Sequence, residues 1–530
     1  MARLLHELIL EQAGRRPDAT VITHRHSHWD YAALASQIQA VGHGLRALGL
    51  NRADRVAVYL PKRMETVAAL FGAALAGGVF VPINPLLKPE QVAYILRDCN
   101  VRILVTARDR ATLLEPALAD CPDLHTLVLT DAAISPPESP RHWRVLDWPA
   151  LLDAPNGPGP ARVIDLDMAA ILYTSGSTGK PKGVVLSHRN LLTGAQSVAE
   201  YLGNRPDDRI LAVLPFSFDY GLSQLTTAFV AGARAVLMDY LLPRDVIGTV
   251  VRESITGLAA VPPMWVQLAA LEWPAAAVAS LRYFTNSGGA MPRATLAALR
   301  RALPRTTPYL MYGLTEAFRS TYLPPEEIDR RPDSIGKAIP NAEILVVRED
   351  GTPCAPGEPG ELVHRGSLVA LGYWNDPSKT AERFRPVPGQ NPGLPLPELA
   401  VWSGDTTRMD EDGFLYFIGR KDDMIKTSGY RVSPTEVEEI LYGSGRVAEA
   451  AALGIPHSTL GQAIVAVIKP LRELFDEGAL IAHCKQHLPN FMVPLRIIAR
   501  ASDLPRNPNG KIDRKALVEE LRALFPEPPP

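Results

Sequence analysis

Residues 173–183 read YTSGSTGKPKG, and they indicate the chemistry of the chain more clearly than any other segment. Glycines allow the backbone unusual conformations. The N–H groups, hydroxyls and lysines of such a loop can surround a polyphosphate. The apolar run 169–173 predicts a short buried strand before the loop, and residues 189–201 predict the helix that follows it, a common setting for phosphate loops.

The loop is not the common nucleotide-binding loop of the Walker A type. That motif requires GxxxxGK followed by Ser or Thr, and counting from Gly176 its second glycine would fall at Pro181. The stretch is therefore either a different kind of phosphate loop or a solvated turn, which clusters of Ser, Gly, Thr and Lys often form.

Length and composition limit the class of protein. A chain of 530 residues is too long for a single core, so two or more domains are expected. With 46% hydrophobic and 21% charged residues and a net charge of −2, nothing indicates nucleic acid as a partner. The apolar run 67–83 contains glycines and a proline, so it predicts a buried helix and a strand, not a membrane span. The scattered cysteines form no CxxC pair and suit the cytoplasm.

The order of apolar segments predicts an α/β fold with layered, mainly parallel sheets and helices. Predicted strands alternate with helical stretches through the first 400 residues, at 55–60, 78–83, 102–106, 125–129, 210–214, 234–237 and 257–261. Around 344–366 the strands alternate with glycine and proline turns, which predicts a small β-rich, barrel-like subdomain.

A charged segment at 420–423 marks the predicted domain boundary. We expect a large N-terminal domain over 1–419 and a small C-terminal α+β domain over 420–530. The second is predicted to contain helices at 434–442 and 478–487 and strands at 447–455 and 462–469.

Residues 173–183 resemble the signature loop of the AMP-forming, adenylate-forming superfamily, which includes acyl-CoA synthetases, adenylation domains of peptide synthetases, and luciferases. Further segments follow in the order seen in that superfamily, and the resemblance covers about residues 4–521. They read SGGA at 287–290, YGLTE at 312–316, WSGD at 402–405, GRKDD at 419–423 and NPNGKIDR at 507–514. The resemblance implies binding of ATP and Mg²⁺, activation of a small carboxylic acid as an acyl-adenylate, and release of pyrophosphate.

The resemblance also implies roles for individual residues. Lys180 and the rest of the loop would hold the departing pyrophosphate, Thr315 and Glu316 would serve phosphate and metal, and Lys511 would reach the substrate carboxylate. A positioned cation there stabilises charge that builds up during attack. The implied ATP-binding residues are Thr174, Ser175, Gly176, Ser177, Thr178, Gly179, Gly288, Gly289, Ala290, Tyr312, Asp405 and Arg420.

A second half-reaction forms a thioester, and the resemblance implies that the mobile C-terminal domain rotates between the two steps. It places the hinge near Asp422 and brings Lys426 and Gly429 to the thiol. The acceptor is CoA or the phosphopantetheine arm of a separate carrier protein.

The identity of the acid depends on residues 214–222, LPFSFDYGL. Acyl-CoA synthetases usually carry a histidine where this chain has Phe218, whereas amino-acid adenylation domains carry Phe-Asp, with the aspartate pairing the substrate amine. A buried Asp219 needs a partner. That partner is a substrate ammonium or, alternatively, Arg319, which could instead bind a second anionic or hydroxylated substrate group.

Several other residues are predicted to line the acid site. With Asp219 and Arg319 these are Ser223, Met264, Thr285, Ser287, Met311 and Ser320. Overall the chain is similar to AMP-forming acyl-CoA ligases associated with exosortase A systems, and around Asp219 to prolyl-carrier-protein ligases. Two other functions stay open: a luciferase-type oxygenase and a non-catalytic nucleotide-binding relative.

Overall fold

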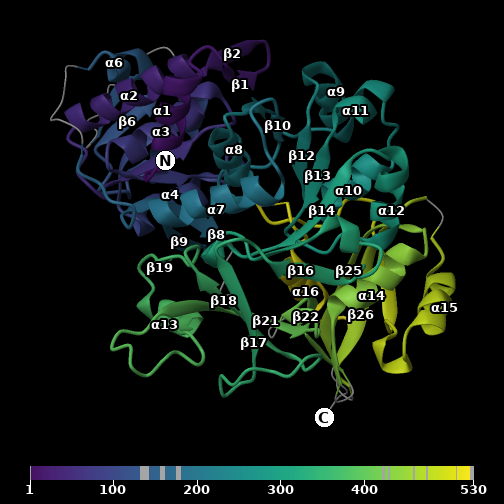
Figure 1. Cartoon of the computed structure of the whole chain (residues 1–530). Coiled ribbons are helices and arrows are strands. Elements are labelled where there is room, and N and C mark those ends of the chain that lie inside the picture. Colours follow the sequence, from purple (N-terminus) through teal and green to yellow (C-terminus); the bar gives the residue numbers. More distant parts are fainter. Residues whose placement is uncertain are drawn as a thin grey trace.

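The structure is a computed structural model that describes residues 2–131, 143–154, 161–174, 181–420, 424–427, 430–457, 460–472, 475–508 and 510–525. Figure 1 shows sheets layered with helices, and the C-terminal segment forms a separate lobe at one side. The predicted α/β class is confirmed, and three sheets organise the described residues.

The first sheet is parallel over most of its width. Its strands from β8 to β7 run parallel, while β9 and β19 at one edge are antiparallel. The predicted strands at 55–60, 78–83, 102–106 and 125–129 are confirmed. In spatial order the strands are β19 (Gly372–Tyr373), β9 (Lys182–Ser187), β8 (Met168–Thr174), β4 (Val79–Pro82), β3 (Arg55–Tyr59), β5 (Val101–Thr106), β6 (Thr126–Leu129) and β7 (Arg144–Asp147).

The predicted strand at 169–173 and the predicted helix at 189–201 are confirmed, but a strand that the sequence did not indicate lies between the loop and this helix. After the loop the chain forms strand β9, which pairs with β8 in an antiparallel hairpin, and helix α7 (His188–Tyr201) begins only after β9. The reason is the buried run Val184–Leu186, which completes the sheet edge, while Ser187 and Asn190 cap the helix. The predicted phosphate loop therefore lies between two paired strands and not directly before a helix.

The second sheet changes from parallel to antiparallel along its width. The neighbouring strands β14, β13, β12, β10, β11 and β1 run parallel to one another. Strand β2 at one edge and the strands on the other side of β14 run antiparallel to their neighbours. Its strands, in spatial order, are β17 (Ala342–Val347), β18 (Gly360–Gly366), β21 (Leu399–Met409), β22 (Leu415–Arg420), β16 (Ser334–Ala338), β15 (Thr321–Leu323), β14 (Thr307–Tyr312), β13 (Tyr283–Asn286), β12 (Gly257–Ala260), β10 (Arg209–Ala212), β11 (Arg234–Leu237), β1 (Thr20–His24) and β2 (Ser27–Asp30), and β20 (Phe384–Pro386) pairs with β21.

The β-rich segment after residue 340 exists as predicted, but in the described residues it does not form a closed barrel. Its strands pair in an open array that continues through β16 and β15 into the parallel part of the second sheet. Because these strands bond to an existing sheet edge, they need no closure of their own.

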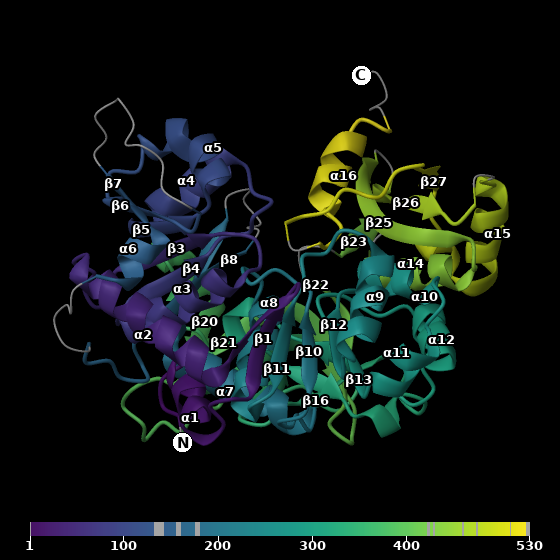
Figure 2. The same ribbon diagram turned by 90° about the horizontal axis from the view of Figure 1, so that it is seen from above.

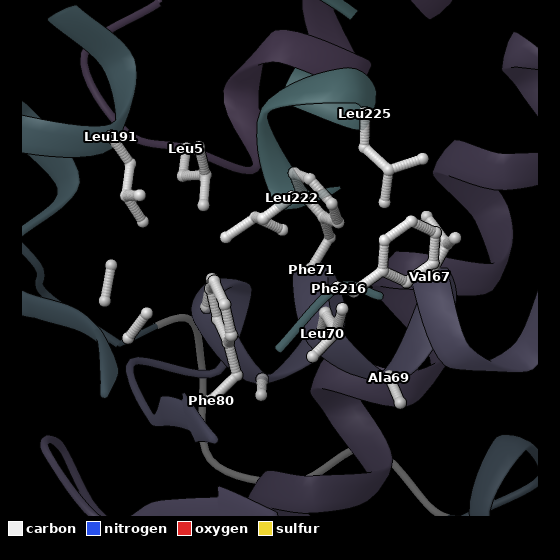
Figure 3. Close-up of a cluster of buried hydrophobic side chains, with 14 of the residues drawn as sticks. Leu5, Val67, Ala69, Leu70, Phe71, Phe80, Leu191, Phe216, Leu222 and Leu225 are labelled. Atoms are coloured by element: carbon white, nitrogen blue, oxygen red, sulfur yellow. The ribbon is translucent and has the colours of Figure 1, made fainter. Parts of the chain in front are cut away.

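The main core lies where helices pack between the two large sheets. Figure 3 shows Phe71 and Leu70 among Leu222, Leu225 and other apolar side chains. Helix α3 is buried along nearly its whole length. The helices are α1 (Glu7–Arg15), α2 (Tyr31–Ala47), α3 (Met64–Leu75), α4 (Pro89–Asp98), α5 (Arg108–Leu118), α6 (Trp148–Leu152), α7, α8 (Asp219–Ala231), α9 (Pro243–Glu253), α10 (Pro262–Ala269), α11 (Ala275–Ser280), α12 (Arg293–Ala302) and α13 (Pro377–Arg383), with short 3-10 turns at Thr315–Ala317, Pro325–Glu327 and Asn490–Met492.

The C-terminal lobe has its own sheet and core, and Figure 2 shows it beside helices α10 and α12. The predicted helices and strands of this lobe are confirmed. Its elements are β23 (Ile425–Thr427), β24 (Tyr430–Val432), α14 (Pro434–Gly443), β25 (Val447–His457), β26 (Gly461–Pro470), α15 (Glu477–His487), β27 (Arg496–Ala499) and α16 (Arg514–Leu521). The division into domains at residue 420 stays a prediction.

Membrane-spanning helices can be assessed over the described ranges. None of the helices in these ranges combines the length and the apolar character that crossing a bilayer requires.

Buried histidines predict acid sensitivity of the fold. Burial lowers the pKa of His6 and of His188 to about 4 from the ordinary 6.5. The unfolded chain takes up these protons near pH 6.5 and the folded chain only near 4, so acid in this window favours unfolding. We expect the free energy of unfolding to fall between pH 6.5 and about 4, by about 3 kcal/mol for each histidine.

Chemical denaturation at a series of pH values tests this expectation. The His188→Gln variant should lose stability less steeply with acid than the wild type, whereas replacement of the exposed His43 by glutamine should leave the slope as it is. Equal slopes for wild type and His188→Gln would contradict the expectation.

Candidate active site

The predicted site residues gather where four neighbouring parallel strands end. Strands β10, β12, β13 and β14 lie side by side, so the segments that follow them meet at one edge of the sheet. Ligands of open α/β sheets bind at such carboxyl ends. This edge brings together the segments containing Asp219, Ser287–Gly289 and Thr315.

Lys511, from the C-terminal lobe, reaches this edge. Its Nζ lies 5.6 Å from the centre of the Phe218 ring. Gly288 has a φ of +82°, and a Cβ built there would lie 3.1 Å from Lys511 Cε, so glycine leaves room for the lysine. Burial lowers the pKa of Lys511, and the Asp219 carboxylate opposes this shift. The lysine is thus a partly desolvated cation beside a carboxylate.

A tight turn presents Lys511 to the large domain. The backbone N–H of Asn507 donates to the carbonyl oxygen of Lys511 at 2.8 Å. The backbone N–H of Gly510 donates to the carbonyl oxygen of Asn507 at 2.9 Å. The side chain of Asn84, which is buried just after β4, donates from Nδ2 to the Pro508 carbonyl at 2.5 Å. Asn84 therefore ties the lysine-bearing turn to the large domain, a role that no sequence motif indicated.

Replacing Asn84 by alanine is expected to slow adenylate formation about five- to tenfold, because one hydrogen bond that holds the turn contributes about 1 kcal/mol. Thioester formation from a preformed adenylate should be unchanged. Separate single-turnover assays of the two half-reactions check this. Asn100→Ala, which removes a side-chain bond to Asp123 away from the site, is the control. If Asn84→Ala slowed adenylate formation and thioester formation by the same factor, the proposed role of Asn84 in positioning Lys511 would be contradicted.

Asp219 is the first residue of helix α8 and is buried. Thr315 Oγ1 donates to its Oδ1 at 3.1 Å. Burial raises the pKa of Asp219, and the cations of Arg319 and Lys511 oppose the shift. The carboxylate is thus costly to ionise where it stands, and a further cation next to it would be stabilising.

Arg319 lies in the same buried cluster. Its Nη1 donates to Ser287 Oγ at 2.7 Å, and its guanidinium carbon lies 4.8 Å from the centre of the Tyr220 ring. Asp219 and Arg319 are both described, and the Arg319 charge counters the rise that burial causes in the pKa of Asp219, although each makes its hydrogen bond to a different residue. The two charges therefore interact electrostatically without a direct contact between them.

Other residues predicted to line the acid site are buried with their polar groups engaged. Thr285 Oγ1 lies 2.5 Å from the Tyr220 hydroxyl, and Ser223 Oγ lies 3.4 Å from Thr227 Oγ1. The hydroxyl of Tyr201 donates to Met311 Sδ at 2.8 Å. Tyr201 and Tyr220 were missed by sequence reasoning, because aromatic residues in apolar helices are typical of any core.

Asp405 joins the residues predicted to hold the adenosine. Tyr312 donates to its Oδ2 at 2.5 Å and Arg420 Nε to its Oδ1 at 2.9 Å. Burial and the adjacent Asp405 carboxylate raise the pKa of Tyr312. The phenol is therefore a neutral donor, and its ring is held in one orientation beside the carboxylate.

Glu316 is the predicted metal ligand. Tyr373 donates to its Oε1 at 2.5 Å, and Lys182 Nζ lies 5.3 Å from the centre of the Tyr373 ring. No group of three or more His, Cys, Asp or Glu in the described ranges could hold a metal ion by itself. A single carboxylate suits Mg²⁺, which keeps several waters and shares phosphate oxygens. Tyr373, which orients Glu316, carried no sequence signal.

Part of the predicted site lies outside the described residues. This applies to Ser175, Gly176, Ser177, Thr178, Gly179, Lys180, Asp422 and Gly429, and to the side chain of Lys426. Thr174 ends β8, and the preceding Tyr173 donates to Asp98 Oδ2 at 2.5 Å, which anchors the entry to the loop. Ala290 follows Gly289 before helix α12.

Two family models match the chain, and full-length relatives match it as well. The family model of AMP-binding enzymes matches residues 9–374, and that of the AMP-binding enzyme C-terminal domain matches residues 436–511. The chain is 30% identical over 534 residues to the L-proline–[L-prolyl-carrier protein] ligase of Pseudomonas fluorescens, covering 98% of this chain and 99% of the relative. It is 31% identical over 529 residues to the indoleacetate–CoA ligase of Aromatoleum aromaticum, covering 98% of each.

Longer relatives are similar over only a small part of their own length. Identity to one protein of the linear gramicidin synthase of Brevibacillus parabrevis is 30% over 517 residues, which covers 97% of this chain but 10% of that protein. The chain spans 6% of a second protein of the same synthase.

Solved structures share the fold along nearly the whole chain. An anthranilate CoA ligase in complex with anthranoyl-AMP has a TM-score of 0.86 at 26% identity, covering 98% of this chain and 97% of the other. O-succinylbenzoate coenzyme A synthetase from Bacillus subtilis, in complex with ATP and a magnesium ion, has a TM-score of 0.80 at 25% identity, covering 96% and 98%.

Proposed function

Because this chain belongs to the family of AMP-binding enzymes, we propose that it is an AMP-forming acid–thiol ligase. In the first half-reaction an oxygen of the acid carboxylate bonds to the α-phosphorus of ATP, and the bond to pyrophosphate breaks. In the second, a thiol loses its proton and its sulfur bonds to the acyl carbon, and AMP leaves. The products are a thioester, AMP and pyrophosphate.

The observation that carries this proposal is the position of Lys511. The C-terminal lobe delivers this cation to the strand ends, within Coulombic reach of Asp219 and against Gly288 and Phe218. A cation held in a desolvated site stabilises negative charge that develops on a phosphoryl group. We assign Lys511 to the acid carboxylate and the α-phosphate oxygens.

We assign the remaining groups to ATP. Tyr312 would lie against adenine, Asp405 with Arg420 would hold the ribose, and Thr315 would contact the α-phosphate. Glu316 would hold Mg²⁺, which when bound supplies positive charge to the phosphates. The loop Thr174–Lys180 would hold the departing pyrophosphate.

For the thioester step we propose that the C-terminal lobe rotates about a hinge near Asp422. The thiol must approach the acyl carbon from a side that Lys511 partly occupies, so the lysine has to withdraw. Lys426 and Gly429 would then line the path of the thiol. Rotation about a few hinge residues is a common mode of domain switching.

We propose that the acid carries an amine that Asp219 binds. The support is a buried carboxylate whose pKa burial raises against the charges of Arg319 and Lys511, and which accepts a hydrogen bond from Thr315. A substrate ammonium would complete its partners. The resemblance around Asp219 to prolyl-carrier-protein ligases agrees with this assignment.

The acceptor is CoA or the pantetheine arm of a carrier protein, in the cytoplasm, where ATP and CoA are available. Full-length relatives of both kinds exist. We further propose that the chain belongs among the acyl-CoA ligases associated with exosortase A systems, which its sequence resembles.

An exchange assay tests the proposal. Labelled pyrophosphate should enter ATP only when the enzyme, Mg²⁺ and a suitable acid are present, and a panel of amino acids, fatty acids and aryl acids identifies that acid. Mass spectrometry of products formed with CoA or with a pantetheinylated carrier then identifies the thiol. If no acid in the panel increases the exchange of pyrophosphate into ATP, the proposed function is contradicted.

A further inference from the structure

Arg319 is a buried cation that forms no ion pair within the described residues. Only 2% of the residue is exposed. It donates a hydrogen bond to the hydroxyl of Ser287, and its Nε is buried with no partner in the described part of the chain. A guanidinium stays charged at all ordinary pH values, so this position buries a full positive charge.

The surroundings of Arg319 fix its orientation, but no carboxylate in the described residues contacts its guanidinium directly. The Tyr220 ring lies 4.8 Å from the guanidinium carbon, and the Tyr220 hydroxyl is held by Thr285 at 2.5 Å. A cation–π contact compensates only part of the cost of burial. The Asp219 carboxylate interacts with the Arg319 charge, yet it accepts its hydrogen bond from Thr315 and does not contact the guanidinium.

Arg319 belongs to the acid site and not to a distant part of the core. Its partner Ser287 directly precedes Gly288, whose added Cβ would lie 3.1 Å from Lys511 Cε. Its aromatic neighbour Tyr220 directly follows Asp219. The same short segments thus hold Lys511, Asp219 and Arg319.

We propose that the acid substrate carries a second carboxylate, which Arg319 binds. The inference rests on the proposed function, because it concerns the acid that this site activates. The N–H groups of a guanidinium match the oxygens of a carboxylate in a paired geometry. Since Asp219 binds an ammonium, the substrate class is an amino dicarboxylic acid, of which one carboxylate is activated and the other stays on Arg319.

Pyrophosphate exchange with matched acids tests this inference. The pairs glutamate and glutamine, and aspartate and asparagine, differ chiefly in the second charge, and glutarate and succinate lack the amine. We expect one amino dicarboxylic acid to exchange with a kcat/KM about 100-fold or more above that of its amide, since a buried ionic contact discriminates strongly. Exchange with singly charged acids alone would overturn the inference and leave the proposed function standing. No exchange with any acid would overturn both.

Variants of Arg319 test the contact itself. Arg319→Gln should raise the KM for the preferred dicarboxylic acid about 100-fold and shift preference toward its amide, with ATP affinity unchanged. Arg319→Lys keeps the charge and should restore part of the preference. The matched control is Arg282→Gln, which breaks an ion pair with buried Asp208 and should lower thermal stability without changing acid preference. A folded Arg319→Gln enzyme with the wild-type KM and preference would overturn the inference.

Discussion

Replacing Lys511 by alanine is expected to slow acyl-adenylate formation by about 100- to 1000-fold, because a preorganised charge in a desolvated site is lost. Transfer of a preformed acyl-adenylate to the thiol should continue near the wild-type rate, since the lysine withdraws for that step. Single-turnover assays of each half-reaction measure the two rates separately. A Lys511→Ala enzyme that forms the adenylate normally would contradict the role of this residue.

The pH dependence of adenylate formation provides a second test of the role of Lys511. Burial lowers the pKa of Lys511 below its usual value of 10.5, so the lysine loses its proton at a lower pH than an ordinary one. The rate of adenylate formation should fall as the pH rises through that lowered pKa, and this fall should be absent in Lys511→Ala. Lys515→Ala, four residues further along the chain, is the matched control and should keep both the rate and its pH dependence.

Replacing Asp219 by asparagine is expected to weaken binding of the amine-bearing acid by about 100-fold, because the substrate ammonium loses its buried counter-ion. Asparagine can still accept the hydrogen bond from Thr315, so the fold around α8 should remain intact. The KM for the acid, measured by exchange, should rise, while the KM for ATP should stay the same.

A control for this variant is Asp208→Asn. Asp208 is also buried and pairs with Arg282 at 2.6 Å, away from the strand ends. Its replacement should lower thermal stability and leave acid preference unchanged. An Asp219→Asn enzyme with the wild-type KM for every acid would show that Asp219 does not contact the substrate.

Strands and helices were predictable where their patterns are local. The parallel strands β3 to β6 and the buried helix α3 follow from apolar runs bounded by turns. Strand β9 was missed because it begins within the last residues of the loop motif, at Lys182, and its pairing with β8 decides its structure. The pattern after residue 340 predicts a barrel-like subdomain where the structure has an open array, because strand pairing between distant segments leaves no trace in the sequence of either strand.

Site residues were predictable where they belong to a motif. Lys511, Thr315 and Asp219 were found in this way, and the structure brings them to one edge. Asn84 and Tyr373 were not found, because their roles depend on partners far away in the sequence; the Asn84 contact to Pro508 spans 424 positions. Single residues of this kind become visible only when the fold places both partners together.

The most direct test of acid activation follows one oxygen atom. The identified acid is supplied with its carboxylate labelled with the heavy oxygen isotope, together with ATP, Mg²⁺ and the thiol, and the AMP is analysed by mass spectrometry. If the carboxylate attacks the α-phosphorus and AMP then leaves the acyl carbon, each AMP carries one labelled oxygen. AMP without the label, or labelled phosphate formed together with ADP, would contradict the account.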